Sequence, residues 1–471
     1  MIRFETHWKS IAGSTWLFSV SFLFVAAGCY PIEEPGGVVN VPLEDSPAGS
    51  LSAWAEERAL DNLGASADGV VGCNIVTAST GRVTIFNRIF GTPGLEQDGL
   101  YQTSSEDGGL SWSAMTPFAP AHKDGMGLNV AIDSSDRIHA IWREMQPVMG
   151  IFYARSEDQG VSWSEAVLIS HPARYQNNGG ILTVDFKQRV HVMYFDGDAN
   201  SEAMPCEAYY TRSVDAGLTW ESPRMLSRDD GKHSAWPRAD FSGVEGDDLC
   251  IVWREQVLGD DWDIRGAISN DGGSTWVEAL VAGGNGDTDT QWDPMAAVDK
   301  AGRFHVSYMN SSAGDPFEIA IHNIRSVDGG ATWSEPQVLS EARSRFSFYA
   351  YDRVRDILWC SFKDESEFDL SDGNSHSKIV TRYSTDHGET WSSLEVVTNE
   401  VDRSYEIRFP AFSMGADGKL RVTYSHTPEG VDPPYTVYYR ERRSVPATGF
   451  SAPKAAGVHD EVVPLGGSMR R

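Results

Sequence analysis

The stretch Ser326-Val327-Asp328-Gly329-Gly330-Ala331-Thr332-Trp333 decides the fold of this chain, because its pattern recurs along the sequence. The pattern is Ser-x-Asp-x-Gly-x-Ser/Thr-Trp, and successive copies begin 51 to 58 residues apart. The six copies begin at Ser105, Ser156, Ser213, Ser269, Ser326 and Ser384. A near-constant period of this length indicates an array of one supersecondary unit, so we expect a fold built from repeats.

Each copy of the pattern is typical of the turn in a β-hairpin. An apolar run precedes it, as at Ile151–Ala154, and a strand-like run follows the Trp. The Asp carboxylate can accept hydrogen bonds from backbone N–H groups two residues further on, and the Trp ring can fold back over the turn. The fifth position is Gly in all copies, as a backbone with positive φ requires: Gly109, Gly160, Gly217, Gly273, Gly330 and Gly388.

A second segment also recurs, consisting of a tight polar turn followed by an apolar strand. It occurs seven times, at residues 82–88, 137–143, 189–195, 248–254, 303–309, 357–363 and 419–425. Each occurrence is preceded by another short apolar strand, such as Leu128–Ile132. The repeat is therefore expected to be a sheet of four antiparallel strands, and such sheets arranged around an axis form a β-propeller.

We expect an all-β protein with a single β-propeller of seven blades, and six blades is the alternative. The seventh unit lacks the Trp-containing turn, so its fourth strand must come from elsewhere in the chain. The two candidates are Val38–Val41, before the first blade, and Glu461–Val463, near the C-terminus.

The repeated turn resembles the Asp-box, or BNR, repeat of sialidases and several other β-propeller families. In propellers of this kind the Asp-box is a structural turn on the face opposite the ligand site. The resemblance therefore implies a structural role for Asp107, Asp158, Asp215, Asp271, Asp328 and Asp386. It says little about chemistry, because Asp-boxes also occur in proteins that are not enzymes.

The N-terminus is typical of an export signal. Arg3 and Lys9 precede an apolar run over residues 11–25, which ends in Ala26-Ala27-Gly28-Cys29. That ending resembles a bacterial lipobox, in which Cys29 would be lipidated; an uncleaved anchor is the alternative, but the run is short for a spanning helix. The expected location is the bacterial cell envelope, lipid-anchored and facing the periplasm or exterior.

These features predict four regions. They are a signal peptide at residues 1–28, a lipid-anchored linker at 29–66, the propeller at 67–446 and a C-terminal tail at 447–471. The linker is a candidate source of the ring-closing strand.

The net charge and the side-chain patterns indicate which ligands and cofactors the protein is expected to bind. The net charge of −28 argues against nucleic acid, whose phosphates would be repelled. We expect no cofactor; Ca²⁺ bound by the acidic loops at 260–263 and 287–289 is the weaker alternative. Buried packing rather than metal binding or disulfide formation is expected for His139, His191, His305, Cys73, Cys250 and Cys360. The pairing of Cys206 is left open.

Strand order places the starts of the innermost strands and the ends of the second strands on the face opposite the Asp-boxes. Arginines, carboxylates and indoles occupy these positions. We expect a central ligand site formed by Arg88, Arg143, Glu144, Arg238, Arg254, Glu255, Trp292 and Arg408. For the segments 142–144 and 253–255, bridging between neighbouring blades is an equally weighted alternative.

The resemblance to sialidases implies a catalytic set. In those enzymes three arginines clamp the substrate carboxylate, a Tyr activated by a Glu attacks the anomeric carbon, and an Asp is the general acid. Tyr405 and Glu406 are the candidate nucleophile pair here, although adjacent strand residues point to opposite faces. The chain departs from the family because Val70–Ile75 lacks the Arg-Ile-Pro signature, and no motif assigns the general acid.

The expected function is that of an exported, membrane-anchored, sialidase-like propeller that recognises glycans or another surface ligand. Two alternatives stay open: an active exo-sialidase or related exo-glycosidase, and a non-catalytic protein-assembly scaffold.

Overall fold

The computed structural model describes residues 53–443, with gaps at 61–68, 91–98, 119, 122–124, 173–176, 199–200, 202, 242–246, 259–260, 285–288, 312–317, 341–342, 366–376, 399–404 and 429–435. The expected signal peptide, Cys29, the C-terminal tail and both candidate ring-closing segments lie outside these residues. The described residues form strands joined by turns and loops, and none of them belongs to a helix of the length and apolarity that a membrane crossing needs.

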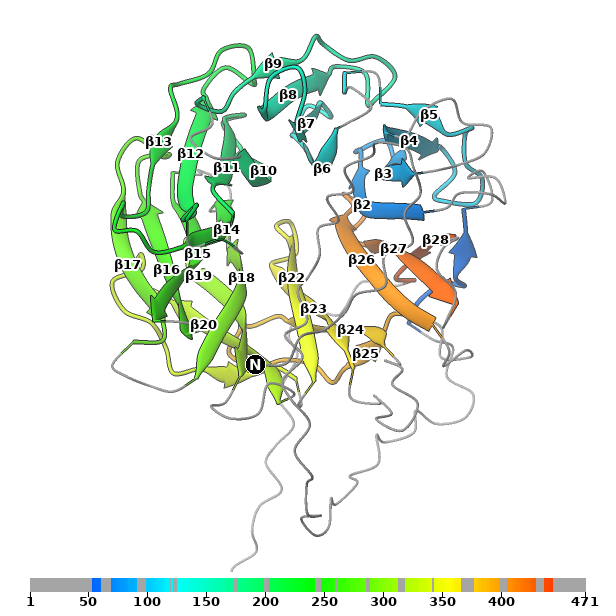
Figure 1. Cartoon of the computed structure of the whole chain (residues 1–471). Coiled ribbons are helices and arrows are strands. Elements are labelled where there is room, and N and C mark those ends of the chain that lie inside the picture. The colour runs from blue at the N-terminus through cyan, green and yellow to red at the C-terminus, as the bar shows by residue number, and fades with distance from the viewer. Residues whose placement is uncertain are drawn as a thin grey trace, which may run out of the picture. The chain divides into compact units, whose positions relative to one another are not determined.

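The strands form seven four-stranded antiparallel sheets around a common axis (Figure 1). The innermost strands are β2 (Gly69–Thr77), β6 (Met126–Ile132), β10 (Asn177–Val184), β14 (Ser234–Phe241), β18 (Thr290–Val298), β22 (Ser344–Asp352) and β26 (Tyr405–Met414). The second strands are β3 (Val83–Phe90), β7 (Ile138–Glu144), β11 (Val190–Asp196), β15 (Leu249–Leu258), β19 (Phe304–Ser311), β23 (Ile357–Asp364) and β27 (Leu420–Pro428).

The outer half of each sheet is a third strand and a short edge strand. The third strands are β4 (Gly99–Ser105), β8 (Gly150–Ser156), β12 (Glu207–Ser213), β16 (Asp261–Ser269), β20 (Ile319–Ser326), β24 (Lys378–Ser384) and β28 (Thr436–Glu441). The edge strands are β5 (Thr116–Pro117), β9 (Val167–Leu168), β13 (Arg224–Met225), β17 (Val277–Ala282), β21 (Gln337–Val338), β25 (Glu395–Val396) and β1 (Arg58–Ala59). We number the blades 1 to 7 in the order of their innermost strands.

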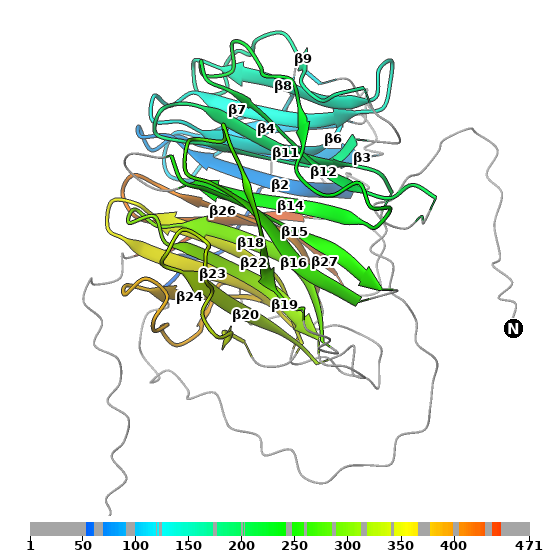
Figure 2. The same ribbon diagram turned by 90° about the vertical axis from the view of Figure 1, so that its left-hand side faces the viewer.

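Seven blades are therefore present, so the prediction of a seven-bladed propeller is confirmed and the six-bladed alternative is wrong. Each innermost strand contacts the innermost strands of both neighbouring blades, and β2 contacts β26, which closes the ring. Figure 2 shows the blades side by side, with their strands running between the two faces of the ring.

The ring-closing strand comes from before blade 1. Strand β1 pairs antiparallel with β28, with Arg58 opposite Tyr439 and Ala59 opposite Tyr438. Trp54 forms a further bridge to Arg442 and is 1% exposed. This segment falls within the expected linker, outside the two candidates named from the sequence. Because the N-terminal and C-terminal parts of the described chain share blade 7, ring closure is non-covalent.

Large apolar side chains of the second and third strands fill the space between neighbouring blades. One such cluster, between blades 2 and 3, includes Ile141, Tyr153, Val192 and Tyr194. Each large apolar side chain that is fully buried contributes about 1.5–3 kcal/mol to stability. The free cysteines Cys250 and Cys360 are buried among such residues, as the sequence predicted, and Cys206 is also free and buried.

The Asp-boxes are hydrogen-bonded turns. In the first box, Asp107 accepts from the Ser105 hydroxyl at 2.8 Å and from the Ser111 backbone N–H at 2.9 Å and hydroxyl at 2.5 Å. The two Ser111 hydrogen bonds are the largest causes that lower the pKa of Asp107 to about 2. In each of the other five boxes the Asp carboxylate likewise accepts a hydrogen bond from the hydroxyl of the first Ser.

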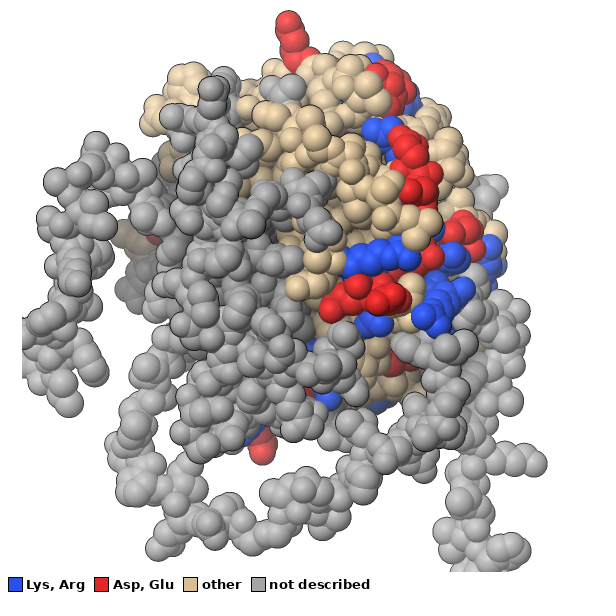
Figure 3. Space-filling view, turned by 90° about the vertical axis from the view of Figure 1, so that its right-hand side faces the viewer, with Lys and Arg blue, Asp and Glu red and all other residues tan. Residues whose placement is uncertain are grey.

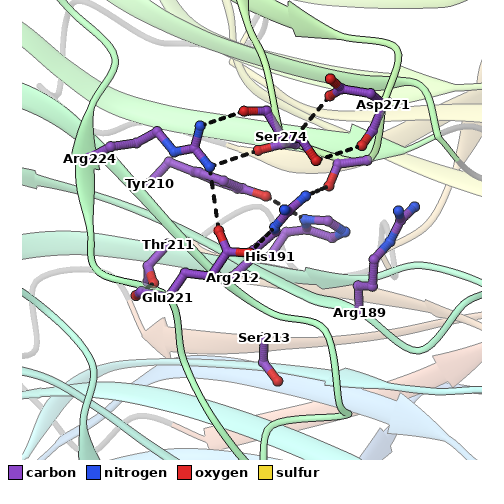
Figure 4. Close-up of polar contacts among 12 residues, drawn as sticks. Arg189, His191, Tyr210, Thr211, Arg212, Ser213, Glu221, Arg224, Asp271 and Ser274 are labelled. Carbon is purple, nitrogen blue, oxygen red and sulfur yellow. Dashed lines mark hydrogen bonds and ion pairs between the residues drawn. The ribbon is translucent and has the colours of Figure 1, made fainter.

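The boxes also join neighbouring blades. Arg224 of blade 3 donates to the backbone carbonyls of Gly273 and Ser274 in the box of blade 4, at 3.0 and 2.8 Å (Figure 4). Tyr210 of blade 3 packs against Trp276 of the same box, with ring centroids 4.9 Å apart. The Trp therefore packs against the preceding blade.

Candidate functional site

The Asp-boxes and the predicted site residues lie on different faces of the ring. The second strand of blade 2 begins at Ile138, which pairs with the Asp-box residue Ser156, and ends near Arg143, which pairs with Ile151. The turns between the first and second strands lie at the Asp-box end, because Thr80 of one such turn bonds to Gln159 of an Asp-box at 3.1 Å. The predicted site residues at the ends of the second strands therefore lie on the opposite face, as the sequence indicated.

Side chains from distant blades meet at the Asp-box end. Arg353, in the turn after β22 of blade 6, lies over the ring of Phe186, in the turn after β10 of blade 3, at 5.8 Å. Arg353 also donates to the carbonyl of Val298 at 3.0 Å. The contact between Arg353 and Phe186 therefore joins side chains of blades 3 and 6 at the Asp-box end.

Every innermost strand carries a register shift, or β-bulge, near the face opposite the Asp-boxes. Trp236, Asp293 and Phe346, in three consecutive blades, have φ of 51°, 42° and 52° at this position. Positive φ is costly for residues with a side chain, by about 1–3 kcal/mol, and such strain gathers at functional sites. Bulges re-aim side chains, and here they present Trp236 and Asp293 near the arginines of blade 4.

Arg254 is the most distinctive residue of this face. Its guanidinium carbon lies 3.9 Å from the ring centroid of Trp236 and 4.4 Å from that of Trp262. Its Nε is buried with no hydrogen-bond partner among the described residues, and no described carboxylate forms an ion pair with it. Burial lowers the pKa of Arg254, while the charge of Asp293 acts in the opposite direction. The guanidinium is held by indoles instead of by an acid.

Arg238 lies in the same blade, at the position where regular pairing resumes after the bulge. Burial lowers its pKa, and Asp293 again provides the opposing charge. One of its NH groups donates to the Pro237 carbonyl at 3.0 Å. Two half-buried arginines therefore share the electrostatic influence of one carboxylate.

Blades 1 and 2 bring a second pair of arginines together. Burial and the positive charge of Arg88 lower the pKa of Arg143 to about 10, although the charge of Asp198 raises it. Arg143 is 8% exposed. The predicted residues Arg88, Arg143, Arg238 and Arg254 therefore form two pairs of buried or half-buried cations on one face.

The predicted carboxylates have partners within their own blades. Glu144 is 1% exposed and accepts from the Trp142 indole at 2.5 Å. Glu255 pairs with Arg265 at 3.0 Å, and burial raises its pKa. These contacts hold the indoles and strands in place, which agrees with a packing role; a role in ligand contact stays a prediction for both residues.

The remaining predicted site residues lie elsewhere or are not described. Trp292 is half-buried and packs against the apolar cluster between blades 5 and 6, which includes Met309. Tyr405, Glu406 and Arg408 belong to β26, but their side chains lie outside what the structure describes. The nucleophile pair therefore stays a prediction.

The sequence analysis missed one polar group on this face. His171, in the loop before β10, places Nε2 3.3 Å from a carboxylate oxygen of Asp196. Its Nδ1 lies 2.8 Å from the Tyr194 hydroxyl, and its ring stacks on Tyr209 with centroids 4.2 Å apart. Asp196 is the last residue of β11, and no local pattern in the sequence marks His171.

The expected structural histidines are buried in networks at the other end of the ring. His139 and His191 each contact a Tyr hydroxyl and an Asp carboxylate, and His191 lies 2.8 Å from Tyr210 and 3.1 Å from Asp185. His305 lies 3.6 Å from Asp299. Within the described ranges, no three His, Cys, Asp or Glu side chains are arranged to hold a metal ion. Asp263 and Asp289 of the acidic loops accept hydrogen bonds from Gly284 and Asn310, both at 3.1 Å.

The outer surface shows how cations are neutralised elsewhere. On the side drawn in Figure 3, basic and acidic side chains lie next to one another. Lys419 lies 3.0 Å from Glu441, and Arg442 lies 2.8 Å from Glu395. Arg254 and Arg238 differ from these surface cations because indoles and a distant carboxylate take the place of a close acid.

Comparisons with known proteins agree with this architecture. The family model of the BNR/Asp-box repeat matches residues 382–393, which contain the whole of the sixth box. No curated protein sequence matches the chain. A protein of unknown function from Dyadobacter fermentans aligns with a TM-score of 0.51 at 13% identity, over 83% of this chain and 99% of that one.

Two further solved structures are similar in fold. An ulvan lyase, a polysaccharide lyase also solved with a glucuronate and sulfated rhamnose ligand, aligns with a TM-score of 0.54 at 13% identity, over 79% of this chain and 94% of that one. The sialidase NanB from Streptococcus pneumoniae aligns at 0.41 and 12% identity, over 80% of this chain and 68% of that one. The chain is a seven-bladed β-propeller with Asp-box repeats, and its fold is similar to that of the ulvan lyase.

Proposed function

We propose that this propeller recognises an acidic glycan on the face opposite the Asp-boxes, with Arg254 as the anchoring residue. The observation that carries the proposal is the Arg254 guanidinium, covered by Trp236 and Trp262 and without an ion pair to any described carboxylate. A carboxylate or sulfate can accept two hydrogen bonds from the edge of a guanidinium in plane.

The energetics favour an anionic ligand. Removing a cation from water costs several kcal/mol, and cation–π contacts offset about 2 kcal/mol of that when the cation is desolvated. An anionic group of the ligand that pairs with Arg254 would offset the rest of this desolvation cost. The arginines on this face also attract an anion against the overall charge of −28, because their charges act at short range.

A glycan is favoured over other anions for two reasons. The half-buried indole of Trp236 stands beside the guanidinium, and an aromatic ring provides flat apolar surface for the face of a sugar ring. The ulvan lyase of similar fold has been solved with an acidic saccharide, which supports this ligand class as an analogy of fold.

Catalysis is a second candidate function, favoured by one observation. His171 and Asp196 lie 3.3 Å apart at the same end of the ring, and a half-buried His beside a carboxylate can move a proton. A glycan-cleaving enzyme that transfers a proton to or from the sugar would use such a group, whereas an exo-sialidase would rely on the predicted Tyr405 and Glu406 pair. The cleavage reaction is tested separately from binding.

We further propose that the protein is exported and lipid-anchored through Cys29. The apolar run and the lipobox-like ending support this location. Incorporation of radiolabelled palmitate in a bacterial host is expected for the wild-type chain and not for Cys29→Ser. Equal labelling of both would contradict the anchor.

Binding is tested by calorimetry with acidic and neutral oligosaccharides. Loss of two charge-assisted hydrogen bonds in Arg254→Ala is expected to weaken binding by about 2–4 kcal/mol, roughly 30- to 1,000-fold. Arg345→Ala is the matched control, because Arg345 also lies on this face but is paired with Glu365 at 3.1 Å. Unchanged affinity in Arg254→Ala, or equal losses in both variants, would overturn the proposal.

Turnover is tested with a fluorogenic sialoside and a panel of other aryl glycosides. An enzyme would lose activity in His171→Ala while keeping its affinity for the uncleaved ligand. Binding without turnover of any glycoside would favour a recognition protein.

A further inference from the structure

Large apolar side chains project from the turns at the Asp-box end of the ring. Among the described residues, the six most exposed of these side chains all lie in an Asp-box, directly after one, or in a turn between a first and a second strand. They are Leu110 (67% exposed), Val161 (69%), Leu218 (65%), Val277 (71%), Val327 (69%) and Val354 (77%). Because removing apolar surface from water is favourable, this end of the ring offers contacts to an apolar partner.

Three of these side chains occupy one position of the repeat. Leu110, Val161 and Leu218 are each the sixth residue of their box, two residues before the Trp. The turn that carries them is fixed by the Asp of the box; the N–H of Leu110, for example, donates to the Asp107 carboxylate at 3.0 Å. Blades 1, 2 and 3 therefore each hold an apolar side chain outward at an equivalent place.

The described chain begins at the same end of the ring. The carbonyl of Ala53 accepts a hydrogen bond from the Arg443 N–H at 2.8 Å. Trp54 forms its bridge to Arg442, whose N–H donates to the carbonyl of Leu420 at 2.9 Å. Leu420 is the first residue of β27, and second strands begin at the Asp-box end. The residues that precede Ala53 therefore join the propeller at the Asp-box end.

This point of attachment is where the proposed lipid anchor is connected. Residues 30–52 separate Cys29 from Ala53. A random coil of this length would have a mean reach of about 25–30 Å. A tether attached at one end of the ring brings that end, on average, closer to the membrane than the other end.

Charges at the Asp-box end favour a zwitterionic lipid surface over an anionic one. Two exposed acids of the boxes are paired with arginines: Glu157 lies 3.0 Å from Arg155, and Glu389 lies 3.2 Å from Arg325. An anionic leaflet would repel a protein whose net charge is −28. Phosphatidylcholine and phosphatidylethanolamine carry no net charge, so they leave the apolar contacts unopposed.

From these observations we infer that the Asp-box end is a membrane-contacting surface, and that its partner is the zwitterionic lipid layer that holds the anchor. The inference rests on the proposed lipid anchor at Cys29. Apolar side chains at the tips of rigid turns enter the boundary between headgroups and acyl chains, as the apolar faces of interfacial helices do. The face that carries Arg254 is then turned away from the membrane, towards the proposed glycan.

A fluorescent probe at each end of the ring tests this orientation. Val327→Cys places a thiol in the fifth box, and Val148→Cys places one in the loop after β7 on the opposite face, where Val148 is 50% exposed. Each variant is labelled with an environment-sensitive thiol probe, and the unsubstituted chain corrects for labelling elsewhere. The full chain, acylated in a bacterial host, is reconstituted in phosphatidylcholine vesicles that contain nitroxide-labelled lipid.

We expect the nitroxide lipid to quench the probe at position 327 and to shift its emission to shorter wavelength, with neither effect at position 148. Quenching at position 327 is expected to be lost when Leu110→Ser, Val161→Ser and Leu218→Ser are combined. Val148→Ser is the matched control and is expected to leave it unchanged. Far-ultraviolet circular dichroism confirms that each variant is folded.

The outcomes distinguish this inference from the proposed anchor. An acylated, vesicle-bound chain that is quenched equally at both positions, or more strongly at position 148, would overturn the inference and leave the anchor intact. Quenching at position 327 that survives the three serine substitutions would also overturn it, because the apolar turns would then not orient the propeller. Stronger quenching in phosphatidylglycerol than in phosphatidylcholine would contradict the zwitterionic partner. A chain that carries no acyl group and stays in solution would overturn the anchor, and this inference with it.

Discussion

Substituting the two adjacent glycines of the first Asp-box separates backbone strain from inter-blade packing. Gly108 and Gly109 have φ of 70° and 84°, so alanine at either position is held in a left-handed conformation. That strain costs about 1–2 kcal/mol. A Cβ at Gly108 meets nothing within 4 Å, whereas a Cβ at Gly109 overlaps the Tyr439 ring, whose Cδ1 would be 2.8 Å away. Tyr439 is 1% exposed and cannot move into solvent without leaving the core of blade 7.

Overpacking a core costs about 1–3 kcal/mol beyond the strain. We therefore expect Gly108→Ala to lower the free energy of unfolding by about 1–2 kcal/mol and Gly109→Ala by about 2–5 kcal/mol. Urea unfolding followed by tryptophan fluorescence measures both changes. Because Tyr439 belongs to the blade that closes the ring, Gly109→Ala is also expected to speed proteolysis near β1.

The result that would refute this reasoning is a Gly109→Ala variant no less stable than Gly108→Ala. The contact between the first Asp-box and blade 7 would then be absent, and the account of ring closure would fail with it.

Three further predictions follow from buried and hydrogen-bonded groups. Asp185→Ala removes the carboxylate that bonds His191 and Arg189 and is expected to cost about 3–5 kcal/mol in urea unfolding; a loss below about 1 kcal/mol would contradict the network. Hydrogen bonds hold several Asp-box pKa values near 2, below the usual 3.8, so their stabilisation is complete above pH 3.8 and is lost as pH falls toward 2. Urea midpoints that stay level from pH 5 to pH 2 would exclude this effect. Burial raises the pKa of the Cys206 thiol, so a thiol reagent is expected to modify Cys206 only after unfolding, and rapid labelling of the native protein would disprove its burial.

Local chemistry explains why most of the fold could be predicted from the sequence. The Asp, Gly and Trp of each box act within eight residues, and the same pattern predicts the same turn in every blade. Packing between blades could not be read in this way. Tyr439 and Tyr210 approach box glycines that are far away in sequence, and only the assembled ring shows that those glycines also have to lack a side chain.

The ring-closing strand was missed for a similar reason. Strand β1 has two residues, Arg58 and Ala59, and two residues carry no alternation of polar and apolar side chains. The longer apolar run at Val38–Val41 gave a stronger local signal. Pairing with β28 decides which segment closes the ring, and that pairing depends on the whole propeller.

The candidate site was predicted in part. The order of the strands within a blade can be read from the repeat alone. That order predicts which face carries the site and which arginines lie on it. The bulge in β14 shifts the register between Ala235 and Arg238, so simple alternation does not predict that Trp236 covers Arg254. Trp262 belongs to a segment that the sequence marks only as acidic, so its contact with Arg254 was not predicted. His171 lies close to Asp196 because the loop before β10 passes the end of β11, and no local pattern predicts that contact.

The most direct test of the central claim is a crystal structure of the protein with a bound acidic oligosaccharide. The account predicts an acidic group of the ligand in hydrogen-bond contact with Arg254, beside Trp236 and Trp262, on the face opposite the Asp-boxes. An oligosaccharide bound at the Asp-box face, or on this face without contact to Arg254, would contradict it.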